Sequence, residues 1–137
     1  MKFNKLQITG IILFCVFLIA NVFFFFVKDC CAANVSLQEI KLETINQDNW
    51  LELSKNSESV IIDVRTSQEF LEKNIDNSIN IDFYSDDFKE KLNSLDKSKT
   101  YLIYCRSGNR SGKTLKIMKE LGFMIVYDLK GGINGLN

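Results

Sequence analysis

The hydrophobic pattern of residues 37–137 changes repeatedly between short continuous apolar runs and amphipathic stretches. Two runs, Val60–Val64 and Tyr101–Tyr104, are apolar at nearly every position, which is typical of parallel strands buried on both faces of a sheet. Shorter apolar groups predict three further strands, which lie near Ile40–Ile45, Ile79–Ile81 and Met124–Tyr127. Helical patterns separate these runs, so the order of elements alternates between strand and helix.

The clearest helical pattern lies between the last two predicted strands. Leu115, Met118 and Leu121 recur at a spacing of three residues, with Ile117 alongside them, which predicts an amphipathic helix. Gly122 follows directly and is suited to end that helix.

Two shorter helices are predicted near the start of this region. The segment 48–55 has a helical apolar face made of Trp50, Leu51 and Leu53. Thr66 and Glu69 have the spacing of a capping box, in which the hydroxyl caps the helix and the carboxylate reaches back. This box predicts a short helix that runs through Phe70 and Leu71.

A fourth helix is predicted to begin at Asp86. Ser85 is a suitable N-cap, and the acids Asp86 and Asp87 would lie in the first turn, where the helix dipole favours negative charge. Its apolar face consists of Phe88, Leu92 and Leu95.

Strands that alternate with helices predict an α/β fold with a small, mainly parallel central sheet flanked by helices. Binding sites of such sheets lie at the carboxyl ends of the strands. Cys105 follows directly after the strand 101–104, so it is expected at that edge. Near the end of the chain, Gly131 and Gly132 predict a turn.

Residues 1–33 differ in kind from the rest. Lys2 and Lys5 precede the apolar run 11–27, which only Asn21 interrupts, and seven of the eleven phenylalanines fall in this segment. The pattern predicts one N-terminal hydrophobic helix that acts as a signal peptide or as a membrane anchor. The positive-inside rule then places the following domain, 37–137, outside the cytoplasm: at the cell membrane if the segment stays, or exported if it is cleaved.

Composition removes several classes of function. The chain has no histidine, which excludes Ser-His-Asp and Cys-His catalysis and histidine-based metal sites. Outside residues 1–33 it carries 14 Lys and Arg against 16 Asp and Glu, of 17 each in the whole chain. This slightly acidic balance argues against nucleic acid as a partner. The Asn-, Lys- and Ile-rich, proline-free composition suggests a bacterial source.

The four cysteines do not form a recognisable framework. Cys15 lies in the apolar run, and Cys30 and Cys31 are adjacent just after it, where lipidation is one open alternative. None of the spacings matches a zinc site or a set of disulfides. We therefore expect no zinc site at these cysteines.

Cys105 is different, because it opens the run Cys105-Arg106-Ser107-Gly108-Asn109-Arg110-Ser111 between a strand and a helix. Backbone N–H groups and the positive end of the helix dipole converge at such a loop, and two arginines add positive charge. Glycine lets the main chain turn its amides toward one point. These features favour the thiolate of Cys105, which is its reactive form.

This loop resembles the active-site loop of the rhodanese family, which has the signature Cys-Arg-x-Gly-x-Arg-Ser. Other blocks follow in the family's order, namely Asp63-Val64-Arg65 with Glu69-Phe70, Ile75 with Ser78-Ile79-Asn80-Ile81, and Gly131-Gly132-Ile133. Together they cover about residues 37–137. The chain departs from the family by Lys73-Asn74 in place of Gly-His, and by the absence of the tryptophan near Leu136 and of a C-terminal helix.

The resemblance implies a rhodanese-like fold and a thiosulfate-type sulfurtransferase. A thiolate at Cys105 would take the outer sulfur of a small donor anion such as thiosulfate and form a persulfide. A thiol or cyanide acceptor would then remove that sulfur, so the resemblance implies that neither a cofactor nor a metal is needed. The loop amides with Arg106 and Arg110 would hold the charged sulfur, and the side chains that tune the donor would be Arg106, Ser107 and Asn109.

Asp63, Arg65 and Glu69 form a second charged group, for which a structural role is preferred over a catalytic one. Arg65 is expected to pair with an acid near the edge of the sheet, and capping accounts for Glu69. Loss of these residues should destabilise the fold more than it alters the chemistry.

Two other functions stay open at this point. Cys-dependent phosphatases and some arsenate reductases of related fold use a similar loop with five residues between Cys and Arg, whereas four separate Cys105 from Arg110. A rhodanese domain can also serve as a non-catalytic interaction module, although such modules usually lack the cysteine. No protein partner can be named.

Overall fold

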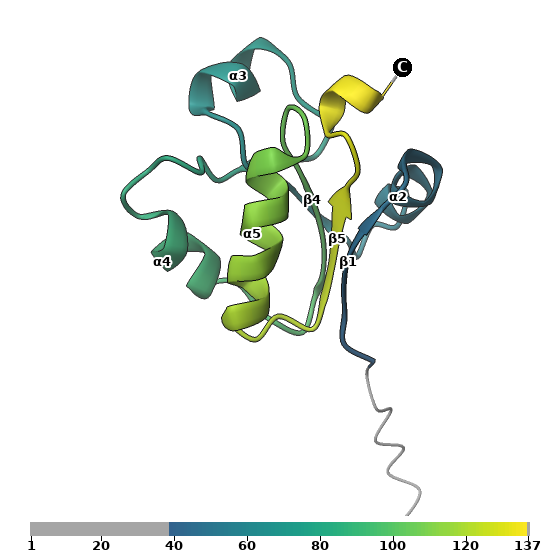
Figure 1. The fold of residues 1–137 in the computed structure, drawn as a ribbon, viewed down its shortest axis with the longest axis vertical. Helices are drawn as coiled ribbons and strands as arrows, with labels where there is room; N and C mark the ends of the chain where they lie inside the picture. Colours follow the sequence, from purple (N-terminus) through teal and green to yellow (C-terminus); the bar gives the residue numbers. More distant parts are fainter. Residues whose placement is uncertain (1–38, 137) are drawn as a thin grey trace, which may run out of the picture. The chain divides into compact units, whose positions relative to one another are not determined.

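The computed structural model describes residues 39–136. Five parallel strands form one sheet in the order β1-β5-β4-β2-β3 within this part of the chain. Figure 1 shows three of them, β1, β5 and β4, side by side. The strands are β1 (Lys41–Ile45), β2 (Val60–Asp63), β3 (Ile79–Asn80), β4 (Thr100–Tyr104) and β5 (Ile125–Leu129). The helices are α2 (Gln47–Ser54), α3 (Ser67–Glu72), α4 (Phe88–Asn93) and α5 (Asn109–Glu120), and a 3-10 turn, η1, spans Ile133–Gly135. The predicted α/β fold with a parallel sheet is confirmed.

The sheet is covered on both faces, and neighbouring residues of the central strands point to opposite sides. Ile62 and Ile103 pack with Met118 of α5 and Leu92 of α4 on one face. On the other face, the buried residues are Trp50 of α2 with Ile61, Leu102, Tyr104 and Leu129. This two-sided burial explains why β2 and β4 are apolar at nearly every position.

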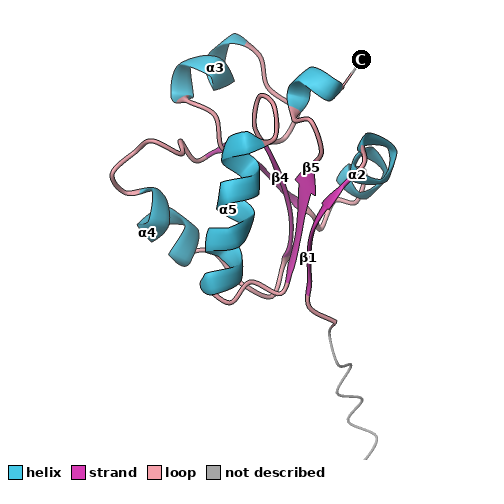
Figure 2. Ribbon diagram, viewed as in Figure 1, coloured by secondary structure: helices cyan, strands magenta, loops and turns pink. Residues whose placement is uncertain are grey.

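Parallel pairing brings the carboxyl ends of the central strands to one edge of the sheet. Asp63 of β2 lies opposite Tyr104 of β4, and the chain leaves both strands toward the same end. Figure 2 shows that the loop between β4 and α5, helix α3 and the C-terminal turn gather at this end. The loop that begins at Cys105 is therefore surrounded by segments from distant parts of the chain.

Two helices differ from their predicted form. Helix α2 covers the expected region, but Leu51 points outward with 37% of its surface exposed. Helix α4 begins at Phe88, so the prediction of a start at Asp86 with Ser85 as the N-cap was wrong. The Ser85 hydroxyl donates to the carbonyl oxygen of Asp82 at 2.8 Å, because the chain forms a turn before the helix starts.

The predicted signal peptide or anchor, residues 1–33, lies outside the described residues, as do Cys15, Cys30 and Cys31. Residues 39–136 hold no helix with the length and apolar character needed to cross a membrane.

Candidate functional site

Cys105 lies immediately after β4, at the carboxyl edge of the sheet, with 1% of its surface exposed. Gly108 precedes α5 with φ of 91°, in the left-handed region that glycine adopts without strain. This single residue turns the loop back toward the sulfur, and the helix begins at Asn109. The predicted use of glycine at this point is confirmed.

Several hydrogen-bond donors surround the sulfur. The Gly108 amide donates to Cys105 Sγ at 3.1 Å, and the Ser111 hydroxyl donates to it at 3.4 Å. Burial raises the pKa of the Cys105 thiol, but hydrogen bonds from Ser111 and from the amides of Ser107 and Gly108 outweigh it, so the pKa is lowered. The loop thus stabilises the thiolate through its main chain and one hydroxyl.

Arg110 is engaged with a carboxylate. Its guanidinium donates to both carboxylate oxygens of Glu69, at 2.6 and 2.8 Å, and it also lies 5.8 Å from the ring centre of Tyr84. The hydrogen bond from Arg110 is the main reason that the pKa of Glu69 is lowered to about 2. The predicted capping box at Thr66 is present as well, so Glu69 both caps α3 and binds α5.

The pKa of Arg110 is raised mainly by Glu69 and further by the charge of Cys105, so this arginine acts on the sulfur as well as on the carboxylate. The positive charge of Arg110 is shared with Glu69, because the two side chains form a two-pronged ion pair. Arg106 is exposed and, within residues 39–136, forms no ion pair with a carboxylate. Ser107 and Asn109 are also exposed, as expected of residues at the mouth of the loop.

A hollow lies beside the loop, between α3 and the C-terminal turn. Three cations line it, Arg65, Lys73 and Arg106, and Glu69 and Glu72 contribute carboxylates. Of these cations, Arg106 follows Cys105 directly in the chain. The hollow therefore collects charged side chains of both signs beside the start of the loop.

Asp63 and Arg65 form a buried ion pair at the carboxyl end of β2. The Arg65 guanidinium donates to both oxygens of Asp63 at distances of 2.6 to 3.0 Å, and it also donates to the Lys73 carbonyl oxygen at the end of α3. The ring of Tyr104 lies 5.7 Å from its guanidinium carbon. These contacts join the end of β2 to the end of α3 and support the structural role predicted for the pair.

The C-terminal turn packs directly beneath the cysteine loop. The Ile133 amide donates to the Cys105 carbonyl oxygen at 2.8 Å, and the Asn134 amide donates to that of Arg106 at 3.1 Å. Gly132 lies so close that a Cβ there would be 2.4 Å from the Cys105 carbonyl oxygen. The sequence signalled a Gly-Gly turn, but it did not place that turn against the loop.

Asp128 is a neighbour of the site that sequence reasoning missed. It lies on β5 with 2% of its surface exposed, and its Oδ2 accepts a hydrogen bond from Thr44 Oγ1 at 3.0 Å. Burial raises the pKa of Asp128, and hydrogen bonding to the nearby hydroxyls only partly offsets that rise. The signal in the sequence that could have identified Asp128 is a single acid within an otherwise apolar strand.

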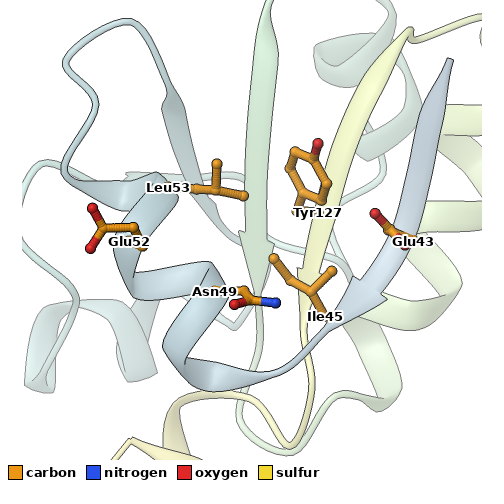
Figure 3. A pocket seen from close by; sticks show the side chains of 6 residues that line it. All are labelled: Glu43, Ile45, Asn49, Glu52, Leu53 and Tyr127. Carbon is orange, nitrogen blue, oxygen red and sulfur yellow. The ribbon is translucent and has the colours of Figure 1, made fainter. Parts of the chain in front are cut away.

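No group of three or more potential metal ligands occurs among residues 39–136, and the expectation that no metal is needed stays a prediction. A second hollow lies on the α2 face of the sheet (Figure 3), and none of the loop residues lines it. Its lining residues are Glu43, Ile45, Asn49, Glu52, Leu53 and Tyr127.

Comparison with known proteins gives a consistent result. The family model described as a rhodanese-like domain matches residues 47–137. The adenylyltransferase and sulfurtransferase of Debaryomyces hansenii is 33% identical over 108 residues, which are 74% of this chain and 24% of that protein. The putative sulfurtransferase of Bacillus subtilis is 37% identical over 81 residues, which are 59% of this chain and 76% of that protein.

Relatives with another activity are also present. The tRNA uridine(34) hydroxylase of Ehrlichia ruminantium is 36% identical over 97 residues, which are 66% of this chain and 36% of that protein. The chain thus spans 24% and 36% of the length of the Debaryomyces and Ehrlichia proteins.

Solved structures agree on the fold. The rhodanese-related protein of Thermoplasma volcanium has a TM-score of 0.59 at 33% identity, over 67% of this chain and 87% of that one. The rhodanese-like domain protein of Staphylococcus aureus has a TM-score of 0.60 at 28% identity, over 69% of this chain and 91% of that one.

Proposed function

The chain belongs to the rhodanese-like domain family, and from that premise we propose that it is a sulfurtransferase whose Cys105 carries the transferred sulfur. The observation that carries the proposal is the set of donors around one buried sulfur atom: the Gly108 amide, the Ser111 hydroxyl and the further loop amides that lower the pKa of the thiol. Such a set suits a group that must hold negative charge on sulfur before and after transfer.

The proposed reaction has two displacement steps. The Cys105 thiolate attacks the outer sulfur of thiosulfate, the sulfur–sulfur bond of the donor breaks, and sulfite leaves with the bonding electron pair. An acceptor thiolate or cyanide then attacks the outer sulfur of the Cys105 persulfide. The persulfide bond breaks, and Cys105 returns as a thiolate. Each step is a covalent transfer that needs no redox partner.

The residues around Cys105 have distinct parts in this proposal. Arg106, exposed beside the hollow that also holds Lys73, would attract the anionic donor. Ser107 and Asn109 lie exposed at the mouth of the loop and would select donors by their shape. Arg110 would fix the first turn of α5 through Glu69 and would also favour negative charge on the sulfur.

The size of the Cys105–Arg110 loop favours sulfur transfer over phosphate hydrolysis. Four residues separate Cys105 from Arg110, and the guanidinium that a phosphatase would direct at an oxyanion is bound to Glu69 instead. A loop of this size accommodates one extra atom on Cys105 more readily than a tetrahedral anion.

The test is incubation of the full chain with thiosulfate, followed by intact and peptide mass spectrometry. We expect one sulfur atom to be added at Cys105 and to be lost when cyanide or a thiol is supplied. The Cys105→Ser variant should gain none, whereas Cys15→Ser, as a matched control, should gain it as the wild type does. A wild-type chain that keeps its circular dichroism spectrum but takes up no sulfur would contradict the proposal.

We further propose that residues 1–33 place this activity at the cell membrane, with the domain outside the cytoplasm, or export it if the segment is cleaved. The support is the pattern of Lys2 and Lys5 before the apolar run 11–27. Cell fractionation combined with protease accessibility tests it. A domain that is recovered only from the cytosol would contradict it.

A further inference from the structure

Tyr84 is a large aromatic residue that lies mostly in solvent and is nevertheless held in place. It belongs to the segment between β3 and α4, and 69% of its surface is exposed. The guanidinium carbon of Arg110 lies over its ring, 5.8 Å from the ring centre. The ring of Phe83 packs against it edge-on, with 5.4 Å between the two ring centres. The rest of the tyrosine ring is open to a ligand.

Both of these contacts place Tyr84 beside the cysteine loop. Arg110 is the second residue of α5, which begins directly after that loop. Phe83 packs against the buried cluster of side chains to which Cys105 belongs. The two contacts come from different elements and agree, so the exposed ring lies at the rim of the loop that holds the sulfur.

The main chain around Tyr84 is fixed by the carboxylate of Asp82. Its Oδ1 accepts from the Tyr84 amide at 2.9 Å, and its Oδ2 accepts from the amide of Ser67, the first residue of α3, at 3.2 Å. The Ser85 amide donates to the Asp82 carbonyl oxygen at 3.1 Å and closes the turn. Because the turn is already ordered, a ligand that contacts the ring has little ordering entropy to offset.

The chemistry of an aromatic ring limits which substrate it can help to bind. Thiosulfate and cyanide are small anions, and the face of an aromatic ring carries the negative end of its quadrupole. A carbon skeleton, in contrast, gains from the same ring by burial of apolar area and by ring-to-ring contact. Of the substrates in the proposed reaction, the acceptor thiol is the one that has a carbon skeleton.

We propose that Tyr84 is a specificity-determining residue, which binds the apolar skeleton of an acceptor thiol while the sulfur of that thiol attacks the Cys105 persulfide. The step is the second displacement described above: a bond forms between the acceptor sulfur and the outer sulfur, and Cys105 leaves as a thiolate. The identity of the substrate rests on the proposed function. The contact between Tyr84 and a ligand at Cys105 is a property of the site and is measurable without sulfur transfer.

The first test compares two alkylating reagents that share one reactive group, iodoacetamide and N-benzyliodoacetamide, on the full chain. Peptide mass spectrometry follows the modification of Cys105, and each rate constant is divided by that of free cysteine. We expect the ratio of the benzyl reagent to iodoacetamide to fall about two- to tenfold in Tyr84→Ser, and to be kept in Tyr84→Phe. The ratio is the readout because a disturbed Arg110 would change the reactivity of the thiol toward both reagents equally.

Ile40→Ser is the matched control, because Ile40 has the same exposed fraction, 69%, and lies next to the amino end of β1, at the opposite edge of the sheet from Cys105. Its ratio should equal that of the wild type. An unchanged ratio in Tyr84→Ser would overturn the inference. An equal fall in Ile40→Ser, or a fall in Tyr84→Phe as large as in Tyr84→Ser, would overturn it as well.

The second test uses the reaction itself. The Cys105 persulfide is formed with thiosulfate, excess donor is removed, and the persulfide is discharged with benzyl mercaptan or with 2-mercaptoethanol. The ratio of the two rates should again fall about two- to tenfold in Tyr84→Ser. If the wild type forms no persulfide, the proposed function fails, and the alkylation ratio still decides whether Tyr84 contacts a ligand at Cys105. If the persulfide forms and the ratio does not fall, the inference alone fails.

Discussion

Gly132 occupies a position where the cysteine loop leaves no room for a side chain. A Cβ at this residue would lie 2.4 Å from the Cys105 carbonyl oxygen and 2.6 Å from backbone atoms of Arg106 and Ser107. Its φ of 62° and ψ of −165° belong to a region that glycine alone adopts readily. The shape of the loop around the sulfur therefore depends on a residue 27 positions away in the sequence.

We expect Gly132→Ala to displace the loop and to destabilise the fold by about 2–4 kcal/mol, because backbone atoms on both sides must move. Persulfide formation should fall with it. Gly131→Ala is the matched control: its φ of 81° is also left-handed, but a Cβ there meets nothing within 4 Å. It should cost only about 1–2 kcal/mol. Denaturant unfolding and thiosulfate labelling check both variants, and equal losses would show that the contact with the loop is unimportant.

The ionisation of Cys105 also illustrates what a single residue contributes. Ser111 provides both a hydroxyl and an amide to the sulfur, whereas Arg110 divides its charge between Glu69 and Cys105. The loop was identified correctly from the sequence. The contributions of its residues to the ionisation of Cys105 differ from those expected from charge alone.

At the scale of elements, one carboxylate joins two helices around the loop. Glu69 closes the capping box of α3 and binds Arg110 in the first turn of α5 through two hydrogen bonds. Since α5 begins right after the cysteine loop, this contact fixes the direction in which the loop amides point. Helix α3, which has no buried residue of its own, depends on such polar contacts.

The pKa of Glu69, lowered to about 2, gives this contact a defined pH dependence. A carboxylate with a depressed pKa stabilises the fold above its unfolded pKa, near 4.5, and this stabilisation is lost as the pH falls from about 4.5 to about 2. We expect Glu69→Gln to lower the free energy of unfolding at neutral pH by about 1–2 kcal/mol. The difference from wild type should disappear at the acid end of that range.

Urea unfolding over a series of pH values measures this effect. Glu72→Gln is the matched control, because Glu72 lies on the same helix but forms no ion pair within residues 39–136. Its unfolding curves should follow the wild type throughout. If the free energy of unfolding of Glu69→Gln were below that of the wild type by the same amount at every pH, the charge of Glu69 would not be the cause of the difference.

At the scale of the whole molecule, the two sides of the sheet share their central strands. Ile62 and Ile103 belong to the core under α4 and α5, and Ile61 and Leu102 belong to the core under α2. Because each strand contributes to both cores, disruption of one side should be transmitted to the other. Trp50, the single tryptophan, is fully buried on the α2 side and reports on that side alone.

We therefore expect Met118→Ala, a cavity in the core under α5, to lower the stability reported by Trp50 fluorescence on the other side. The loss should be about 2–5 kcal/mol, as is usual when a large buried side chain is truncated. Equilibrium unfolding followed by fluorescence and by near-ultraviolet circular dichroism should give one common midpoint. An unchanged fluorescence midpoint would mean that the two cores unfold independently.

Much of this architecture could be predicted, because local sequence patterns specify the strands and helices. Continuous apolar runs identified β2 and β4, and the spacing of apolar residues identified α5. The capping box at Thr66 was also correct, since it involves neighbours in the sequence. The start of α4 was not, because serine also suits a turn, and the Ser85 hydroxyl donates to the Asp82 carbonyl oxygen instead of capping a helix.

The sequence by itself determined the alternation of strands and helices and the position of Cys105 at the start of a glycine-containing loop. Both follow from periodicity and from residues close together in the chain. The tertiary structure alone decided that Glu69 binds Arg110, that Gly132 lies beneath the loop, and that Asp128 accepts a hydrogen bond from Thr44. Parallel strand order brings these distant residues to one edge of the sheet, and no local pattern records which residues will meet there.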